Sequence, residues 1–166
     1  MNNNVFRNLS YGVYIVSCFD GDKFTGCTVN SIMQITSEPA TIALSVNHSN
    51  YTNECLEKTK KFAISILSEK SNPMSIGTFG FRSGRDFFKF SNIPFLMKDN
   101  FPIIKDACGY LVGEIINKVE TSTHTVFIAK ITDGDILNNE TPMTYSYYHN
   151  VVKGKSPKTA PTYIQE

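Results

Sequence analysis

The sequence lacks several features that mark large classes of proteins. Its 166 residues include four cysteines but no Cys-x-x-Cys pair, and charged side chains make up only 19% of the chain. This spacing excludes a zinc ribbon or a dithiol redox motif, and so few charges argue against an intrinsically disordered chain. Lysine and arginine total 16 against 15 acidic residues, a net charge of +1. The chain therefore has no strong field that would attract nucleic acid or an anionic membrane.

Long hydrophobic runs and targeting signals are also absent. The longest apolar runs, such as residues 13–16, fall far short of the roughly 20 residues that a helix needs to cross a bilayer. The N-terminus begins with a run of asparagines and has no apolar signal segment. We therefore expect a cytoplasmic protein with free thiols. The three histidines, at positions 48, 124 and 149, are too widely spaced to indicate a metal site.

What the sequence has is a core and a pattern of strands. Its hydrophobic share of 41% is enough for one domain over residues 1–166. Alternating apolar residues and β-branched runs predict strands at residues 11–18, 23–33, 41–47, 62–67, 109–119 and 125–131. The first two flank Asp20-Gly21-Asp22, a hairpin signal, and the last of them ends at Asp133-Gly134-Asp135. We expect a mainly β, antiparallel sheet that closes into a small barrel.

Helical signals are short. Residues 50–60 follow the N-cap candidates Ser49 and Asn50, and a second helix near residues 74–79 follows Asn72-Pro73. The tail over residues 151–166 carries prolines, glycine and lysines, and we expect it to be extended, either docked on the surface or mobile.

Four stretches carry polar groups that a packed core does not need: residues 26–31, 45–52 and 77–90, and His124. The second lies where a strand meets a helix, where free N–H groups and hydroxyls can bind an anion. The third gathers arginines and a lysine among glycines and aromatics, which suits phosphate recognition. Taken singly, residues 26–31 are better explained as a surface strand, residues 45–52 as ordinary N-capping and His124 as a structural histidine. Residues 77–90 are equally compatible with a solvated loop. No Walker loop, Gly-x-Gly-x-x-Gly motif or catalytic triad is present.

In order and spacing, these stretches resemble the flavin reductase-like family of FMN-binding split barrels. The matching segments are residues 11–17, 26–31, 37–40, 47–52, Gly84-Arg85-Asp86 with Lys89-Phe90, and 124–128. The tail pattern from Tyr148-His149 to Thr162-Tyr163 resembles rubredoxin-fused members of this family. The resemblance implies a six-stranded antiparallel Greek-key split barrel that forms a homodimer with FMN.

The resemblance also implies roles for individual residues. It places Thr28, Val29, Asn30 and Ser31 at the edge of the flavin ring, and Ser45, Val46 and Asn47 along the ring and ribityl chain. At the phosphate end it places Ser49, Tyr51 and Thr52, with Arg85 and Lys89 as positive charges. His124 would lie near the face of the flavin where nicotinamide stacks. A flavin supplies the reactive group itself, so no side-chain nucleophile is needed.

The implied activity is hydride transfer from NADH or NADPH to flavin, with electrons passed onward to rubredoxin, another redox protein or a small molecule. Two alternatives stay open: a non-enzymatic FMN electron carrier of the flavoredoxin type, and a split-barrel binding module without flavin. Phe88 stands where family members often carry Asp, which makes the loop more positive and puts its geometry in question. Cys27 has no neighbour in sequence that would stabilise a thiolate, so we assign it no redox role.

Overall fold

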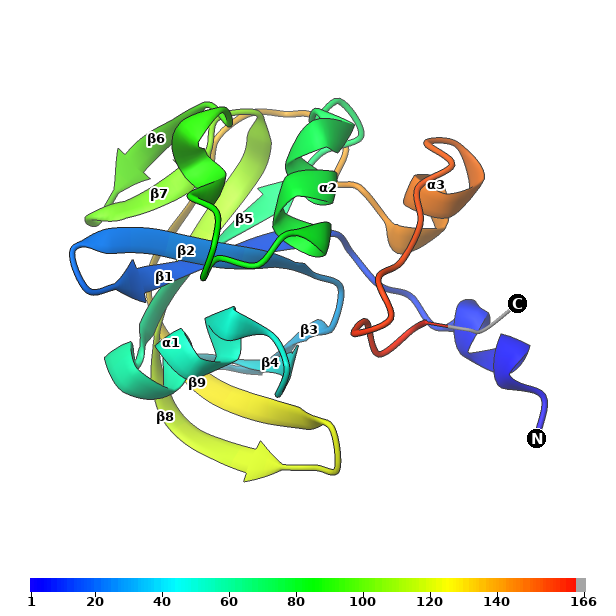
Figure 1. Ribbon diagram of the computed structural model, residues 1–166, viewed down its shortest axis with the longest axis horizontal. Coiled ribbons are helices and arrows are strands. Elements are labelled where there is room, and N and C mark those ends of the chain that lie inside the picture. The colour runs from blue at the N-terminus through cyan, green and yellow to red at the C-terminus, as the bar shows by residue number, and fades with distance from the viewer. Residues whose placement is uncertain (164–166) are drawn as a thin grey trace.

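A curled antiparallel sheet of seven strands forms the centre of the computed structural model, which describes residues 1–163 (Figure 1). The strand order is β2-β1-β5-β8-β9-β4-β3. These strands are β1 (Tyr14–Asp20), β2 (Lys23–Val29), β3 (Ile32–Ser37), β4 (Ala40–Asn47), β5 (Lys61–Leu67), β8 (Ala107–Glu120) and β9 (His124–Ile136). The edge strands β2 and β3 are joined through Asn30-Ser31. The sheet therefore curls back on itself and leaves a seam with no ladder between β2 and β3.

The other elements cover the outside of this sheet. They are the hairpin β6 (Phe95–Lys98) and β7 (Phe101–Ile104), the helices α1 (Tyr51–Thr59), α2 (Pro73–Phe81) and α3 (Tyr145–Asn150), and the 3-10 turns η1 (Asn3–Asn8) and η2 (Lys89–Ser91). Figure 1 shows α3, the N-terminus and the tail up to residue 163 together on one side of the barrel. Among residues 1–163, no helix has the length and apolar character needed to span a membrane.

Local sequence signals explain where several elements begin. The Asn50 side chain accepts a hydrogen bond from Thr52 N at the start of α1, and Asn72 caps α2 in the same way ahead of Pro73. Gly21, with a φ of +59°, makes the β1–β2 turn, which suits a residue without a Cβ. These starts agree with the positions predicted for the hairpin and both helices.

Two apolar clusters hold the barrel together. One lies against α2, η2 and β7 and includes Phe79, Phe90 and Phe101; the rings of Phe79 and Phe90 pack edge to face at 4.9 Å. The other fills the barrel between β4, β5 and β9, with Phe62 and Phe127 fully buried. The core therefore lies on both sides of β1 and β5.

The predicted class, a mainly β antiparallel split barrel, is confirmed, but the strand count differs. Residues 23–33 form two strands because Asn30-Ser31 turn the corner of the sheet. β9 continues past residue 131 to Ile136, so the Asp133-Gly134-Asp135 signal does not end it. A Cβ on Gly134 would lie 2.9 Å from the Tyr110 carbonyl oxygen, so glycine there permits a close strand approach. The hairpin β6–β7, both 3-10 turns and α3 were not predicted.

Candidate functional site

A cleft opens where β2 and β4 end and β9 begins, between the barrel and the C-terminal segment. The β4–β9 register places Asn47 opposite His124 and Ser45 opposite Val126. Seven of the predicted residues line the cleft: Thr28, Val29, Asn30, Ser45, Val46, Asn47 and His124. Segments that are far apart in sequence therefore meet at this one place.

The walls of the cleft combine apolar surface with amides. Val13, Ile76 and Phe81 supply apolar side chains, and Asn50 adds a third amide to Asn30 and Asn47. Thr28 donates its hydroxyl proton to the Ile76 carbonyl at 2.9 Å, which ties β2 to α2. Such a lining suits a flat ligand that has apolar faces and polar edges.

Two predicted residues hold the cleft amides rather than line the cleft themselves. Ser31 donates to the Asn30 Oδ1 at 3.0 Å. The backbone N–H and the hydroxyl of Ser49 both donate to the Asn47 Oδ1, at 2.9 and 2.7 Å. Because each amide oxygen is occupied, the orientation of both amide groups is fixed and each NH2 group is left to bond elsewhere.

His124 presents an unsatisfied ring nitrogen. Its Nδ1 pairs with the Thr123 hydroxyl at 2.8 Å, whereas its buried Nε2 has no hydrogen-bond partner. Burial lowers the pKa of His124, and the nearby Thr159 carbonyl partly offsets this by favouring the protonated ring. The ring therefore offers one free nitrogen in a cleft-lining position.

A second set of predicted residues lies at the start of α1. Thr52 is buried, and its Oγ1 has no partner; the same is true of Thr25 Oγ1 on β2. A Cβ on Gly84 would lie 2.0 Å from Thr25 Oγ1, so only glycine lets the loop after α2 approach so closely. Unpartnered buried hydroxyls are rare in a finished core and indicate a place where a polar ligand can bind.

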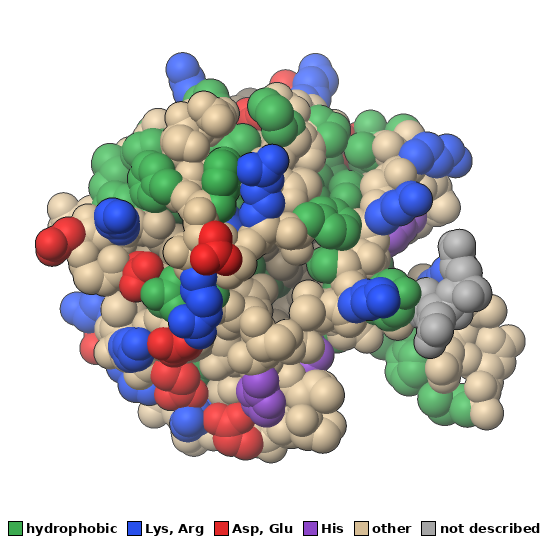
Figure 2. Space-filling view, viewed as in Figure 1, with side chains coloured by type: hydrophobic (Ala, Val, Ile, Leu, Met, Phe, Trp, Pro, Cys, Tyr) green, Lys and Arg blue, Asp and Glu red, His purple; other side chains and the backbone are tan. Residues whose placement is uncertain are grey.

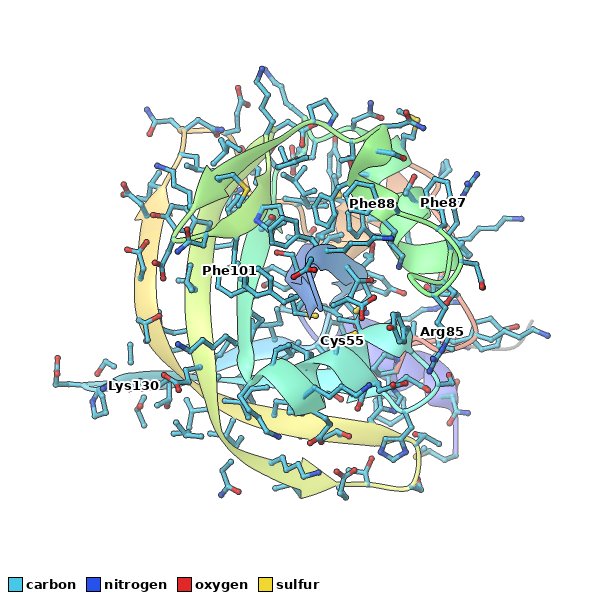
Figure 3. All side chains as sticks on the ribbon, turned by 60° about the vertical axis from the view of Figure 1, so that its left-hand side comes forward. Cys55, Arg85, Phe87, Phe88, Phe101 and Lys130 are labelled. Atoms are coloured by element: carbon cyan, nitrogen blue, oxygen red, sulfur yellow. The ribbon has the colours of Figure 1, made fainter. Side chains whose placement is uncertain are left out.

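The charged groups near α1 are already paired within the chain. Arg85 Nη2 bonds to Glu54 Oε2, and its guanidinium lies 4.3 Å from the centre of the Tyr51 ring. Figure 3 shows Arg85 at the surface beside α1. Tyr51 in turn donates to Asp20 Oδ1 at 2.8 Å, which raises the pKa of its hydroxyl. Lys58 and Arg85 lower the pKa of Glu54. Figure 2 shows acidic and basic side chains interspersed over this part of the surface.

Lys89 lies in the core and is not part of the cleft. Its side chain is almost fully buried, and Nζ donates to the Gly26 and Phe79 carbonyls at 2.7 and 3.1 Å. Burial lowers its pKa. Both acceptors are backbone groups of β2 and α2, so the ammonium fastens η2 to these elements. Phe88, beside it, is 45% exposed.

Sequence reasoning missed the outer wall of the cleft. Tyr145 and Tyr148 of α3 line it, together with tail residues from Lys155 to Pro161. The tail was expected to dock or to move freely, and the structure places it against the cleft. Its tyrosine, glycine and proline pattern was the available signal, but that pattern does not say which surface the tail meets.

Comparison with known proteins identifies the family. The flavin reductase like domain matches residues 6–155. The chain belongs to this family. It is 41% identical to the high molecular weight rubredoxin of Moorella thermoacetica, over 98% of this chain and 72% of that protein. It is 32% identical to the ferric-chelate reductase (NAD(P)H) of Archaeoglobus fulgidus, over 99% of both chains.

Solved structures of flavin reductases share the fold. The NADH:FAD oxidoreductase SgcE6 of Streptomyces globisporus superposes with a TM-score of 0.78 at 20% identity, over 85% of this chain and 84% of that one. The predicted family and split-barrel class are thus confirmed. The family and the reductases among its relatives also confirm the expectation of an oxidoreductase.

The chemistry of the cleft lining fits a flavin, but the cavity of about 60 Å³ is smaller than the roughly 300 Å³ of an ordinary ligand pocket, so its walls must move apart to admit the ring. The apolar walls and fixed amides of the cleft suit the faces and edges of a tricyclic ring, and the free His124 Nε2 adds a polar group to the lining. The unpartnered hydroxyls of Thr25 and Thr52 lie toward α1, the end that the family resemblance gives to the phosphate. Within residues 1–163, no group of three or more His, Cys, Asp or Glu side chains is placed so that it could hold a metal ion.

Proposed function

We propose that this protein is an FMN-dependent flavin reductase that takes a hydride from NADH or NADPH and passes electrons to a separate acceptor. The observation that carries the proposal is the convergence of oriented amides and an unpartnered His124 Nε2 in one apolar cleft. The curated relatives named for flavin or NAD(P)H-dependent ferric-chelate reduction support it. When bound, the flavin supplies the hydride acceptor, so the chain itself needs no nucleophile.

In this proposal, the β2, β4 and β9 residues bind and orient the ring. Thr28, Val29 and Val46 provide walls, while Asn30 and Asn47 offer donors whose direction Ser31 and Ser49 fix. Ser45 precedes Val46 on β4 and completes the lining. Donors held in place before reaction stabilise developing negative charge at little reorganisation cost.

The phosphate end is proposed at the start of α1. Thr52 has a free buried hydroxyl there, α1 contributes its N-terminal dipole, and Tyr51 lies beside Arg85. Arg85 must exchange Glu54 for phosphate to act as a donor. Lys89 contributes no direct contact in this proposal, because both of its hydrogen bonds go to the backbone.

His124 is proposed to face the nicotinamide side of the cleft. Its lowered pKa keeps the imidazole neutral at physiological pH, so that Nε2 can exchange a hydrogen bond with a bound ring. A histidine in this position orients the donor and needs no covalent role.

Electron transfer onward and assembly are part of the same proposal. A separate rubredoxin or other redox protein is the proposed acceptor, a choice supported by the rubredoxin name of one relative. A homodimer is proposed because the exposed faces of β3 and β8 carry Met33, Ile35 and Ile116, a type of surface that often packs against another chain.

Anaerobic titration of the FMN-loaded protein with NADH, and separately with NADPH, tests the proposal. We expect loss of the flavin absorbance near two-electron stoichiometry with at least one nicotinamide. A yellow protein that only a reduced protein partner bleaches would make it an electron carrier. A protein that binds neither FMN nor FAD at micromolar concentration would exclude both flavin-dependent functions. The remaining alternative would then be a split-barrel binding module without flavin.

A further inference from the structure

The C-terminal segment turns back onto the cleft after α3. Lys153 adopts a left-handed φ of +60°, and Gly154 N donates to the Tyr148 carbonyl at 3.0 Å. A Cβ on Gly154 would lie 2.0 Å from the Tyr148 ring, so glycine allows the backbone to cross the ring at contact distance. In Figure 1 the segment runs from α3 along the side of the barrel.

The segment bonds to the same residues that the proposed function places around the ring. Asn30 Nδ2 donates to Thr162 Oγ1 at 2.7 Å, and Asn47 Nδ2 donates to the Thr159 carbonyl at 3.2 Å. Thr162 Oγ1 also donates to the Tyr145 hydroxyl at 2.8 Å. The NH2 groups left free by Ser31 and Ser49 are thus directed at the tail.

The attachment is local and can open without unfolding the barrel. Residues 155–163 belong to no strand or helix, and their backbone makes only turns such as Ala160 N to the Pro157 carbonyl at 2.9 Å. Lys153, Lys155 and Lys158 are exposed. A segment held by a few side-chain bonds, with no ladder, is among the first parts of a protein to detach.

We propose that residues 155–162 are the outer wall of the flavin site and that their attachment makes FMN a resident cofactor instead of an exchanging one. The inference rests on the proposed function. With the segment attached, FMN cannot leave until it breaks the contacts between the tail and the cleft or until the tail opens by itself. With the segment removed, the cleft is open on that side and the flavin exchanges freely.

Truncation measures this role directly. A chain that ends at Ser156 loses the Thr159 and Thr162 contacts, whereas a chain that ends at Tyr163 keeps them and serves as its control. We expect FMN to leave the first at least tenfold faster than the second, because about two hydrogen bonds and the covering wall are lost. The rise in fluorescence as FMN dissociates after dilution gives the rate without any turnover.

A point variant of the full chain covers the case in which truncation impairs folding. Thr162→Val removes the hydroxyl that joins Asn30 and Tyr145 while keeping the side-chain shape, and we expect release about five times faster. Thr132→Val is the control, since its hydroxyl bonds to the Val112 carbonyl outside the cleft. Saturating FMN should also slow tryptic cleavage after Lys155 and Lys158 by at least fivefold.

The outcomes separate the two proposals. Equal release rates in Thr162→Val and wild type, with tryptic cleavage unaffected by FMN, would overturn the role of the tail and leave the flavin site in place. A full-length chain that binds no flavin would overturn the proposed function first, and the tail proposal with it.

Discussion

The two ends of the cleft differ in how their polar groups are satisfied. At the barrel end, Asn30 and Asn47 bond to the tail, and His124 keeps a free Nε2. At the α1 end, Arg85 is paired with Glu54, whereas the buried hydroxyls of Thr25 and Thr52 have no partner. At the first end, a ligand must share or displace the amide bonds to Thr159 and Thr162 of the tail, while His124 Nε2 is free to bond to it. At the second end it must compete with partners within the chain, so the residue type alone does not show availability.

The largest effect should come from the buried lysine. Lys89→Ala removes a side chain from the core and leaves the Gly26 and Phe79 carbonyls without their donor, which we expect to lower the free energy of unfolding by about 3 kcal/mol. Urea unfolding of the apo-protein measures the loss. Lys89→Met, which keeps most of the volume, should retain more of the stability. If Lys89→Met folds normally but weakens FMN binding as strongly as Arg85→Ala, then Lys89 reaches the phosphate after all.

Substituting the two members of the Arg85–Glu54 pair should change FMN affinity in opposite directions. Arg85→Ala should weaken FMN binding about tenfold, since one charge-assisted donor is lost. Glu54→Gln should strengthen binding a few-fold, because it removes both the competitor for Arg85 and a negative charge near the phosphate. Fluorescence titration of each variant with FMN measures both constants. The same dissociation constant in all three proteins would mean that the phosphate lies elsewhere.

His124 should affect the reaction more than flavin retention. His124→Ala removes the free Nε2 but none of the amides, so we expect FMN to stay bound while its reduction by nicotinamide slows about tenfold. Stopped-flow reduction at several nicotinamide concentrations separates donor binding from hydride transfer. His48→Ala, which removes an exposed histidine paired with Glu120, is the matched control. Wild-type rates in His124→Ala would make that histidine structural.

The smallest effect is on the pH dependence of stability. Burial lowers the pKa of both His124 and His149 below the ordinary value of 6.5. The unfolded chain therefore binds more protons than the folded one in the window below pH 6.5, and stability falls as pH drops through it. Thermal melts at pH 7.5 and 5.5 should differ less in the His124→Gln, His149→Gln double variant. An equal difference in both proteins would show that other groups cause it.

Much of the barrel end could be predicted because its signals are local. Strand alternation placed β4, and the strand preceding Asn30 followed from the Asp20-Gly21 turn. The family resemblance then put Asn30, Asn47 and His124 into one site, and all three line the cleft. The corner at Asn30-Ser31 was missed because β-branched and polar residues continue on both sides of it, and only the pairing of β3 with β4 separates the strands.

The other end depends on long-range packing. Nothing local distinguishes Lys89, which enters the core, from Arg85, which stays at the surface. The difference comes from the carbonyls of Phe79 on α2 and of Gly26, which is far away in sequence. The short strands β6 and β7 and the helix α3 are equally dependent on what they pack against. The tail residues could be read as extended, but the Thr159 and Thr162 contacts arise only once α3 turns the chain back.

Crystals of the protein grown with FMN test the central claim most directly. The account predicts flavin density in the cleft, with the ring in contact with Asn30, Asn47 and His124 and the tail closed over it. A cleft still filled by protein side chains or solvent at saturating FMN, or a flavin bound elsewhere on the barrel, would contradict it.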